Sequence, residues 1–216
     1  LFKKYLWETG VSISNIKLIK DLLKKIKKYG ITEDSKILEI ASNDGSFLNL
    51  INKKYNCLTV GIDPAKNFKN KIKKKKIITI INYFNYYQSK KIRTRFNTFD
   101  YIFARNVLAH VPDPNQLVKT CSDLCKKNGD VFFSTINRNP KSFLFAIIGA
   151  EYILNLLPKG THEYEKFIKP SELIGMMENN GLTIKELTGM SYNPVTKNYW
   201  LGKNVDVNYM IQKKKI

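Results

Sequence analysis

Residues 36–63 read KILEIASNDGSFLNLINKKYNCLTVGID, and their pattern decides the fold. The apolar run at 36–40 has the length of a buried parallel strand, and the small, turn-forming residues at 41–45 end it. A helical stretch follows, and a second apolar run at 57–62 ends on Asp63. This order of strand, loop, helix and strand predicts the front half of a nucleotide-binding α/β unit, whose ligands bind at the carboxyl ends of the strands.

The loop after the first strand has the spacing Glu39-x-Ala41-x-Asn43-x-Gly45, and the G-x-G-x-x-G pattern of dinucleotide-binding units is absent. The spacing resembles motif I of class I S-adenosylmethionine-dependent methyltransferases, usually E/D-x-G-x-G-x-G. The resemblance implies S-adenosyl-L-methionine as the cofactor, with Glu39 ordering the loop and the methionine amino group, and Asp63 accepting the ribose hydroxyls. Asn43 tolerates a left-handed backbone, whereas the methyl group of Ala41 would crowd a close ligand. The alternative is an ordinary loop with one structural glycine at Gly45.

Length and composition limit the remaining possibilities. The 216 residues suit one domain, 1–216, and no apolar run reaches the ~20 residues of a membrane-spanning helix. The net charge of +19 comes almost entirely from lysines, and no basic groove with stacking aromatics is evident, so no nucleic-acid partner is expected.

Three cysteines without a C-x-x-C pair indicate neither disulfides nor a zinc site, which fits a reducing compartment. The chain begins at Leu1 rather than Met, so an organelle address stays open.

The rest of the chain continues the alternation that is typical of a Rossmann-like α/β sheet with helices on both faces. Asp113 is a good N-cap with Pro114 at the first helical position, and Gly129 is expected to close that helix. Two late strands are expected to pair antiparallel. The expected helices are 13–29, 87–93, the one from Pro114 and the one from Pro170 to about Gly181. The expected further strands are 77–81, 98–103, 131–135, 182–187 and 205–211.

The segment 143–157 interrupts this alternation. It is largely apolar, carries one acid, Glu151, and has basic residues on both sides. Such a segment suits insertion into the headgroup boundary of an anionic bilayer, and the alternative is a buried helix that roofs the active site; both can hold. We therefore expect residues 139–169 to form a lipid-facing or lid insertion. Its candidate contacts with substrate or membrane are Phe143, Phe145, Ile147, Ile148, Tyr152, Leu156, Lys159 and His162.

The second half of the chain contains specific runs in a fixed order: Phe99-Asp100, HVPDP at 110–114, GDVFFSTINRN at 129–139, GAEYIL at 149–154, PKGTH at 158–162, FIKP at 167–170, YNP at 192–194 and VDVNYM at 205–210. On these runs, the chain from about Phe99 to Lys213 resembles the ubiquinone-biosynthesis O-methyltransferase family, which methylates a catechol hydroxyl of demethylubiquinol and related polyprenyl precursors. The resemblance implies a seven-stranded class I methyltransferase sheet, a polyprenylated quinol substrate and contact with an anionic membrane surface. It also implies a possible ubiquinone-biosynthesis complex, at the cytoplasmic face of the bacterial inner membrane or at the mitochondrial inner membrane.

The first half departs from that family. The runs EIASNDG at 39–45, GIDPA at 61–65 and ARNVLAH at 104–110 are more similar to the nucleotide-sugar C-methyltransferases. The O-methyltransferases carry an E-x-x-E-H motif that is implicated in magnesium binding, and here Asn106 and Ala109 stand at its two glutamate positions. Hard cations prefer carboxylate oxygen, so magnesium is doubtful and no metal ligands are expected. The resemblance also implies a cofactor contact in this loop. It falls on Arg105, a residue of a different type from the one that the family has there.

A catechol hydroxyl must lose a proton of pKa about 10 during methyl transfer, so a base or an oxyanion stabiliser is needed. His110 is the candidate catalytic base, and its alternative role is that of a structural histidine before the Val111-Pro112 turn. His162 serves either substrate gating or a structural turn. Three functions stay open: a quinol O-methyltransferase, a methyltransferase acting on another small molecule such as a nucleotide sugar, and a non-catalytic methyltransferase-like subunit of a lipid-biosynthesis assembly.

Overall fold

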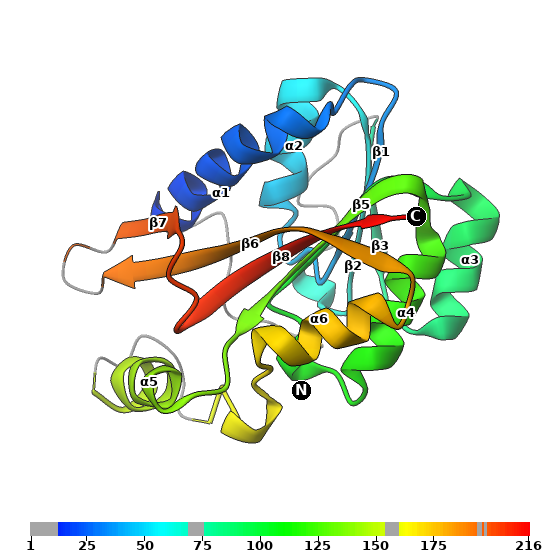
Figure 1. Cartoon of the computed structure of the whole chain (residues 1–216). Helices are drawn as coiled ribbons and strands as arrows, with labels where there is room; N and C mark the ends of the chain where they lie inside the picture. Colours follow the sequence, from blue (N-terminus) through cyan, green and yellow to red (C-terminus); the bar gives the residue numbers. More distant parts are fainter. Residues whose placement is uncertain (1–12, 69–75, 154–159, 194–195, 197) are drawn as a thin grey trace.

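The computed structural model describes residues 13–68, 76–153, 160–193, 196 and 198–216. Its centre is a mixed sheet in the order β3-β2-β1-β4-β5-β8-β6-β7 (Figure 1). The strands are β1 Lys36–Ile40, β2 Leu58–Asp63, β3 Ile77–Ile81, β4 Phe99–Arg105, β5 Cys125–Ile136, β6 Leu182–Asn193, β7 Asn198–Gly202 and β8 Asn208–Lys215. The strand order reverses between β1 and β4, which is where open parallel sheets bind their ligands.

The first five strands run parallel, and β8 then lies antiparallel between β5 and β6. The expected α/β class and the expected antiparallel closing pair are therefore confirmed. The described residues form eight strands rather than the expected seven, because β6 extends to Asn193 and turns back as β7. The rings of Tyr192 and Tyr199 lie 4.4 Å apart across this added pair, and such cross-strand aromatic contacts stabilise a hairpin.

Helices cover both faces of the sheet (Figure 1). The apolar residues of α1 and α2 pack against one face, and those of α3, α4 and α6 pack against the other. Successive strand residues point to opposite faces of the sheet, so Ile37 of β1 packs in one apolar core and Leu38 in the other. The helices are α1 Ile13–Ile26, α2 Ser46–Tyr55, α3 Tyr86–Phe96, α4 Pro114–Leu124, α5 Pro140–Ser142, the π-helix Phe143–Ile153 and α6 Pro170–Glu178.

Gly129 does not close α4, so that expectation was wrong. The helix ends at Leu124, and β5 begins at the next residue and contains Gly129. The pairing of β4 with β5 shifts register here, and a Cβ atom on Gly129 would lie 2.8 Å from the carbonyl oxygen of Asp100. The glycine is needed because β4 approaches closely, not because a helix ends there. By contrast, the expected cap at Asp113 is confirmed, since its carboxylate accepts the Gln116 N–H at 2.9 Å.

The chain between β5 and α6 leaves the sheet as α5 and the π-helix, which stand apart from the other helices (Figure 1). It returns through a short 3₁₀ turn, Tyr164–Lys166. In the described part of the chain, no helix has the length and apolar character that a bilayer crossing requires. The extent of the domain, 1–216, and of the insertion, 139–169, stay predictions.

Candidate active site

The loop after β1 follows a left-handed path at each of the three positions where the motif usually has glycine. The φ angles are 55° at Ala41, 51° at Asn43 and 74° at Gly45. A non-glycine residue in this region costs roughly 1–2 kcal/mol, less for asparagine. The loop therefore keeps a glycine-type conformation although two glycines are replaced, and the strain falls mainly on Ala41.

Asp63, at the end of β2, ties this loop to the sheet. Its Oδ2 accepts the Asn43 N–H at 2.9 Å, and its Oδ1 accepts the Ala65 N–H at 2.8 Å. Burial raises the pKa of the Asp63 carboxyl, and the two N–H donors oppose that rise. Gly61 of the same strand permits the close approach, because a Cβ atom there would lie 2.6 Å from Oγ of Ser42. The structure thus brings the loop and its downstream acid together.

Glu39 lies at the centre of the carboxyl edge and is fully buried. Its Oε1 accepts two hydrogen bonds from Arg105, 3.0 Å from Nε and 2.5 Å from Nη2, and its Oε2 has no hydrogen-bond partner among the described residues. Burial raises the pKa of Glu39 to about 7, although Arg105 acts in the opposite direction. Arg105 also stacks over the ring of Phe47 at 4.2 Å. The sequence suggested both residues for the cofactor but not that they form an ion pair, which depends on the adjacency of β1 and β4.

The loop after β4 carries the positions of the magnesium motif. Asn106 is exposed with a φ of 52°, and its N–H donates to the carbonyl oxygen of Ser134 at 2.9 Å. Ala109 is buried. Among the residues that the structure describes, no three His, Cys, Asp or Glu side chains converge as a metal ion requires. The expectation of a site without metal ligands stays a prediction.

The two histidines of the chain lie together, although 51 positions separate them in sequence. His110 follows β4 in the 3₁₀ turn Leu108–His110, and its ring centroid is 6.2 Å from that of His162. Burial lowers the pKa of His110, and the neighbouring His162 lowers it further. Nδ1 of His162 lies 2.8 Å from Oε1 of Glu151, a fully buried acid of the π-helix. No role for Glu151 was predicted from the sequence, although a lone acid in an apolar run is a usable signal.

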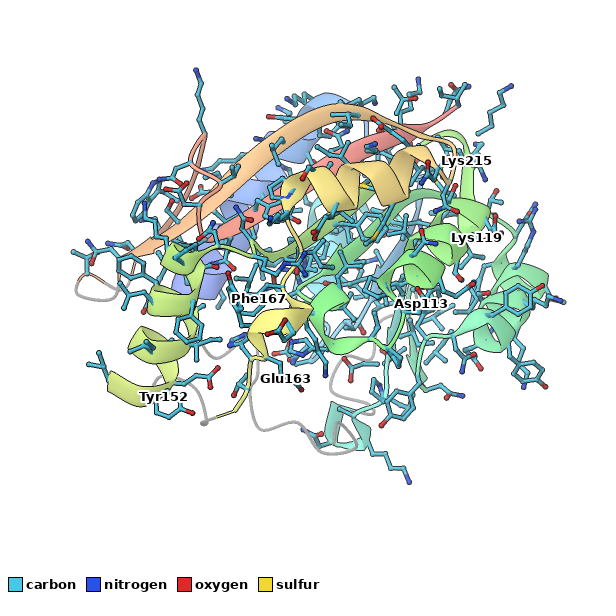
Figure 2. All side chains as sticks on the ribbon, turned by 60° about the horizontal axis from the view of Figure 1, so that its bottom comes forward. Asp113, Lys119, Tyr152, Glu163, Phe167 and Lys215 are labelled. Carbon is cyan, nitrogen blue, oxygen red and sulfur yellow. The ribbon has the colours of Figure 1, made fainter. Side chains whose placement is uncertain are left out.

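The apolar π-helix has an outer and an inner side. Tyr152 of this helix is 54% exposed, whereas Phe167, on the segment between this helix and α6, is buried (Figure 2). Ile147 and Glu151 point inward, four residues apart. The exposed members are Phe143, Leu144, Phe145, Tyr152 and Ile153, and Ile148 is partly buried. Leu156 and Lys159, two further candidates for substrate or membrane contact, lie outside the described residues.

Several basic residues that flank the π-helix are neutralised by acids. Arg138 pairs with Glu172, and Nζ of Lys141 lies 2.5 Å from Oδ2 of Asp206. Nζ of Lys166 lies 2.8 Å from Oε1 of Glu163. The apolar side chains therefore distinguish this surface more than its charge does.

Comparison with known proteins identifies the family. The family described as "Methyltransferase domain" matches residues 14–187. Two relatives named "Ubiquinone biosynthesis O-methyltransferase", from Acinetobacter baumannii (strain AYE) and Marinobacter nauticus, are 66% and 61% identical over 105 residues, which is 49% of this chain. This chain covers 44% of the length of each of these relatives.

The fold agrees with this match. The crystal structure of magnesium protoporphyrin IX methyltransferase from Synechocystis PCC 6803 with bound SAH superposes with a TM-score of 0.65 over 94% of this chain and 84% of that one. The two sequences are 10% identical, so the similarity concerns the fold alone. The expected class I methyltransferase fold is thereby confirmed. Because the family match extends over more than half of the chain, this protein belongs to the methyltransferase domain family.

Proposed function

We propose that this chain transfers the methyl group of S-adenosyl-L-methionine to a catechol hydroxyl of a polyprenylated ubiquinone precursor. The observation that carries the proposal is the 66% identity, over 105 residues, to a protein named ubiquinone biosynthesis O-methyltransferase. The left-handed loop supports a cofactor-binding chain over a non-catalytic subunit, because the loop keeps its path without two of its glycines.

The residues at the carboxyl edge fit this cofactor. Oε2 of buried Glu39, which accepts no hydrogen bond from the part of the chain that the structure describes, is an acceptor for the amino group of the methionine moiety. Each carboxylate oxygen of Asp63 accepts one backbone N–H and keeps a further lone pair for a ribose hydroxyl. Arg105 uses two of its N–H donors on Glu39 and has others for a carboxylate. When bound, S-adenosyl-L-methionine supplies an electrophilic methyl group on a sulfonium.

The acceptor hydroxyl requires a group that takes its proton. A phenol has a pKa of about 10, so a neutral imidazole at the sheet edge assists its ionisation. His110 follows the end of β4 and His162 lies beside it, so both rings are candidates, and the lowered pKa of His110 favours its neutral form.

The exposed side of the π-helix supports contact with the membrane that holds a polyprenylated substrate. Phe145 and Ile153 are 54% and 68% exposed, and an exposed apolar segment with basic flanks suits insertion into the headgroup boundary of a bilayer. The location is then the cytoplasmic face of a bacterial inner membrane, or the mitochondrial inner membrane in a eukaryote. Other proteins of ubiquinone biosynthesis are candidate partners on the same membrane.

The function is tested by transfer of a labelled methyl group to a short-chain demethylubiquinol analogue. The reaction is run with magnesium and with chelator, beside a nucleotide-sugar acceptor and beside the His110→Ala variant. Methylation of the quinol analogue is the expected result. Intact cofactor binding with methylation of the sugar alone would reject the quinol in favour of the second candidate function.

Membrane contact is tested by flotation with vesicles that contain phosphatidylglycerol. Phe145→Ser should weaken binding about fivefold, since re-exposing half of a phenylalanine side chain corresponds to roughly 1 kcal/mol. Tyr86→Ser is a matched control, because Tyr86 is also 54% exposed but lies on α3. Equal effects of the two substitutions would contradict a specific role for the π-helix.

A further inference from the structure

Glu151 is a buried acid with an unusual set of partners. It is fully buried, although it belongs to the apolar π-helix. Its Oε2 accepts the N–H groups of Gly160 at 2.7 Å and Thr161 at 3.2 Å. Its Oε1 accepts the backbone N–H of His162 at 2.9 Å and lies 2.8 Å from Nδ1 of the His162 ring. A buried carboxyl group is tolerated only with such partners.

These contacts determine which ring nitrogen of His162 carries hydrogen. The Glu151 carboxylate accepts three backbone N–H groups, and an ionised carboxylate has no hydrogen to donate. Glu151 is therefore the acceptor in its contact with Nδ1 of His162 as well. Nδ1 of His162 is therefore the donor to Glu151. In the neutral ring Nε2 then carries a lone pair and is the proton acceptor.

The surroundings hold this ring at the edge of the site. The His162 side chain is 13% exposed. The rings of His162 and Phe167 meet edge to face, with centroids 5.9 Å apart. On another side the ring faces His110, with centroids 6.2 Å apart and planes inclined by 32°. The imidazole is thus fixed between the π-helix and the turn that follows β4.

We propose that Glu151 is a positioning residue that holds His162 in the Nδ1–H tautomer, so that Nε2 of His162 takes the proton of the acceptor hydroxyl. The proposal rests on the proposed function. The O–H bond of the catechol breaks, its electron pair stays on oxygen, and the proton binds to Nε2. The Glu151 carboxylate balances the charge of the resulting imidazolium, which returns the proton to solvent after turnover.

The first test is the variant Glu151→Gln. If the glutamine oxygen keeps the N–H groups of Gly160 and Thr161, its NH₂ group takes the place of Oε1. There it faces both the backbone N–H and Nδ1 of His162, so Nδ1–H loses its acceptor and the backbone N–H loses one as well. This arrangement stabilises the opposite tautomer and removes the acceptor at Nε2. We expect kcat to fall by roughly 10²- to 10⁴-fold, with the KM for S-adenosyl-L-methionine within about threefold of wild type. Glu163→Gln is the matched control, because Glu163 lies next to His162 but its side chain is 65% exposed, and its kcat should equal that of wild type.

A second variant covers the case in which Glu151→Gln does not fold. In His162→Asn, the side-chain amide can still donate to Glu151 and keep the turn, but it offers no proton acceptor at the position of Nε2. We expect the same loss of kcat with an unchanged thermal midpoint. Full activity of either folded variant would overturn the proposal.

The tautomer is measured directly by ¹⁵N NMR of the imidazole nitrogens. The chain has two histidines, so His110→Gln leaves the His162 signals alone in the spectrum. We expect hydrogen on Nδ1 in this protein and on Nε2 once Glu151→Gln is added. Hydrogen on Nε2 without that substitution would refute the positioning role. If wild type transfers no methyl group to the quinol, the proposed function fails and the base role fails with it, whereas the NMR result still decides the role of Glu151.

Discussion

Replacing Glu39 by glutamine should change the free energy of unfolding relative to wild type in a pH-dependent way. The variant should gain stability over wild type as the pH rises from acid to neutral. Burial raises the pKa of this carboxyl from 4.5 to about 7, even though Arg105 lies beside it. Below about pH 4.5 the group is protonated in both the folded and the unfolded state and contributes no pH dependence. Between pH 4.5 and 7 the folded protein keeps a proton that the unfolded chain releases, so the stability of wild type falls as the pH rises.

The size of this effect follows from the pKa rise. A rise from 4.5 to about 7 corresponds to roughly 3 kcal/mol. Glutamine has nearly the same shape and does not titrate, so the difference in the free energy of unfolding between Glu39→Gln and wild type should grow by about this amount between pH 4.5 and 8. Other titrating groups contribute equally to both proteins and cancel.

Urea denaturation at several pH values measures this difference. Glu163→Gln is the control, because its side chain is 65% exposed and its stability should differ little from wild type throughout. A difference between Glu39→Gln and wild type that stays constant from pH 4.5 to 8 would refute the reasoning. Such a result would mean that Arg105 fully offsets the burial of the carboxylate.

Ala41→Gly should raise the free energy of unfolding by up to about 1 kcal/mol in urea denaturation, because the left-handed strain at φ 55° disappears while the unfolded chain gains some freedom. Gly61→Ala should lower the affinity for S-adenosyl-L-methionine in calorimetry at least tenfold, since its Cβ atom would lie 2.6 Å from Oγ of Ser42 and displace the loop. Burial lowers the pKa of His110 from 6.5, so the folded state resists a proton that the unfolded chain takes up. Wild type should therefore lose stability relative to His110→Gln as the pH falls below about 6.5, as thermal denaturation can measure.

The sequence predicted those features that depend on neighbouring residues. The strand at 36–40 is buried on both faces, so apolar residues stand on both of them, as Ile37 and Leu38 do. Asp113 and Pro114 start α4 because the cap needs only a side-chain acceptor and a fixed φ within one turn. Asp63 was placed at the site because a residue that ends a parallel strand lies at the ligand-binding edge.

The sequence could not predict features that depend on contacts between distant segments. Gly129 follows a helix at a distance typical of a cap, yet its role comes from the approach of Asp100 on another strand. The ion pair between Glu39 and Arg105 requires β1 and β4 to be adjacent, which is a property of the sheet order. The left-handed conformation of Ala41 goes against its residue type, because Asp63 and the sheet hold the loop on both sides.

The π-helix joins two parts of the proposed function that the sequence suggested separately. Phe145 and Ile153 on its outer side are available to a lipid surface, whereas Glu151 on its inner side holds the turn that carries His162. A rigid movement of this helix would carry the carboxylate with it, because the three residues share one element. The outer substitution Phe145→Ser should therefore weaken vesicle binding and leave the tautomer of His162 unchanged, while Glu151→Gln should do the reverse. If both substitutions changed both properties, the helix would act as a coupled lid and not as two independent surfaces.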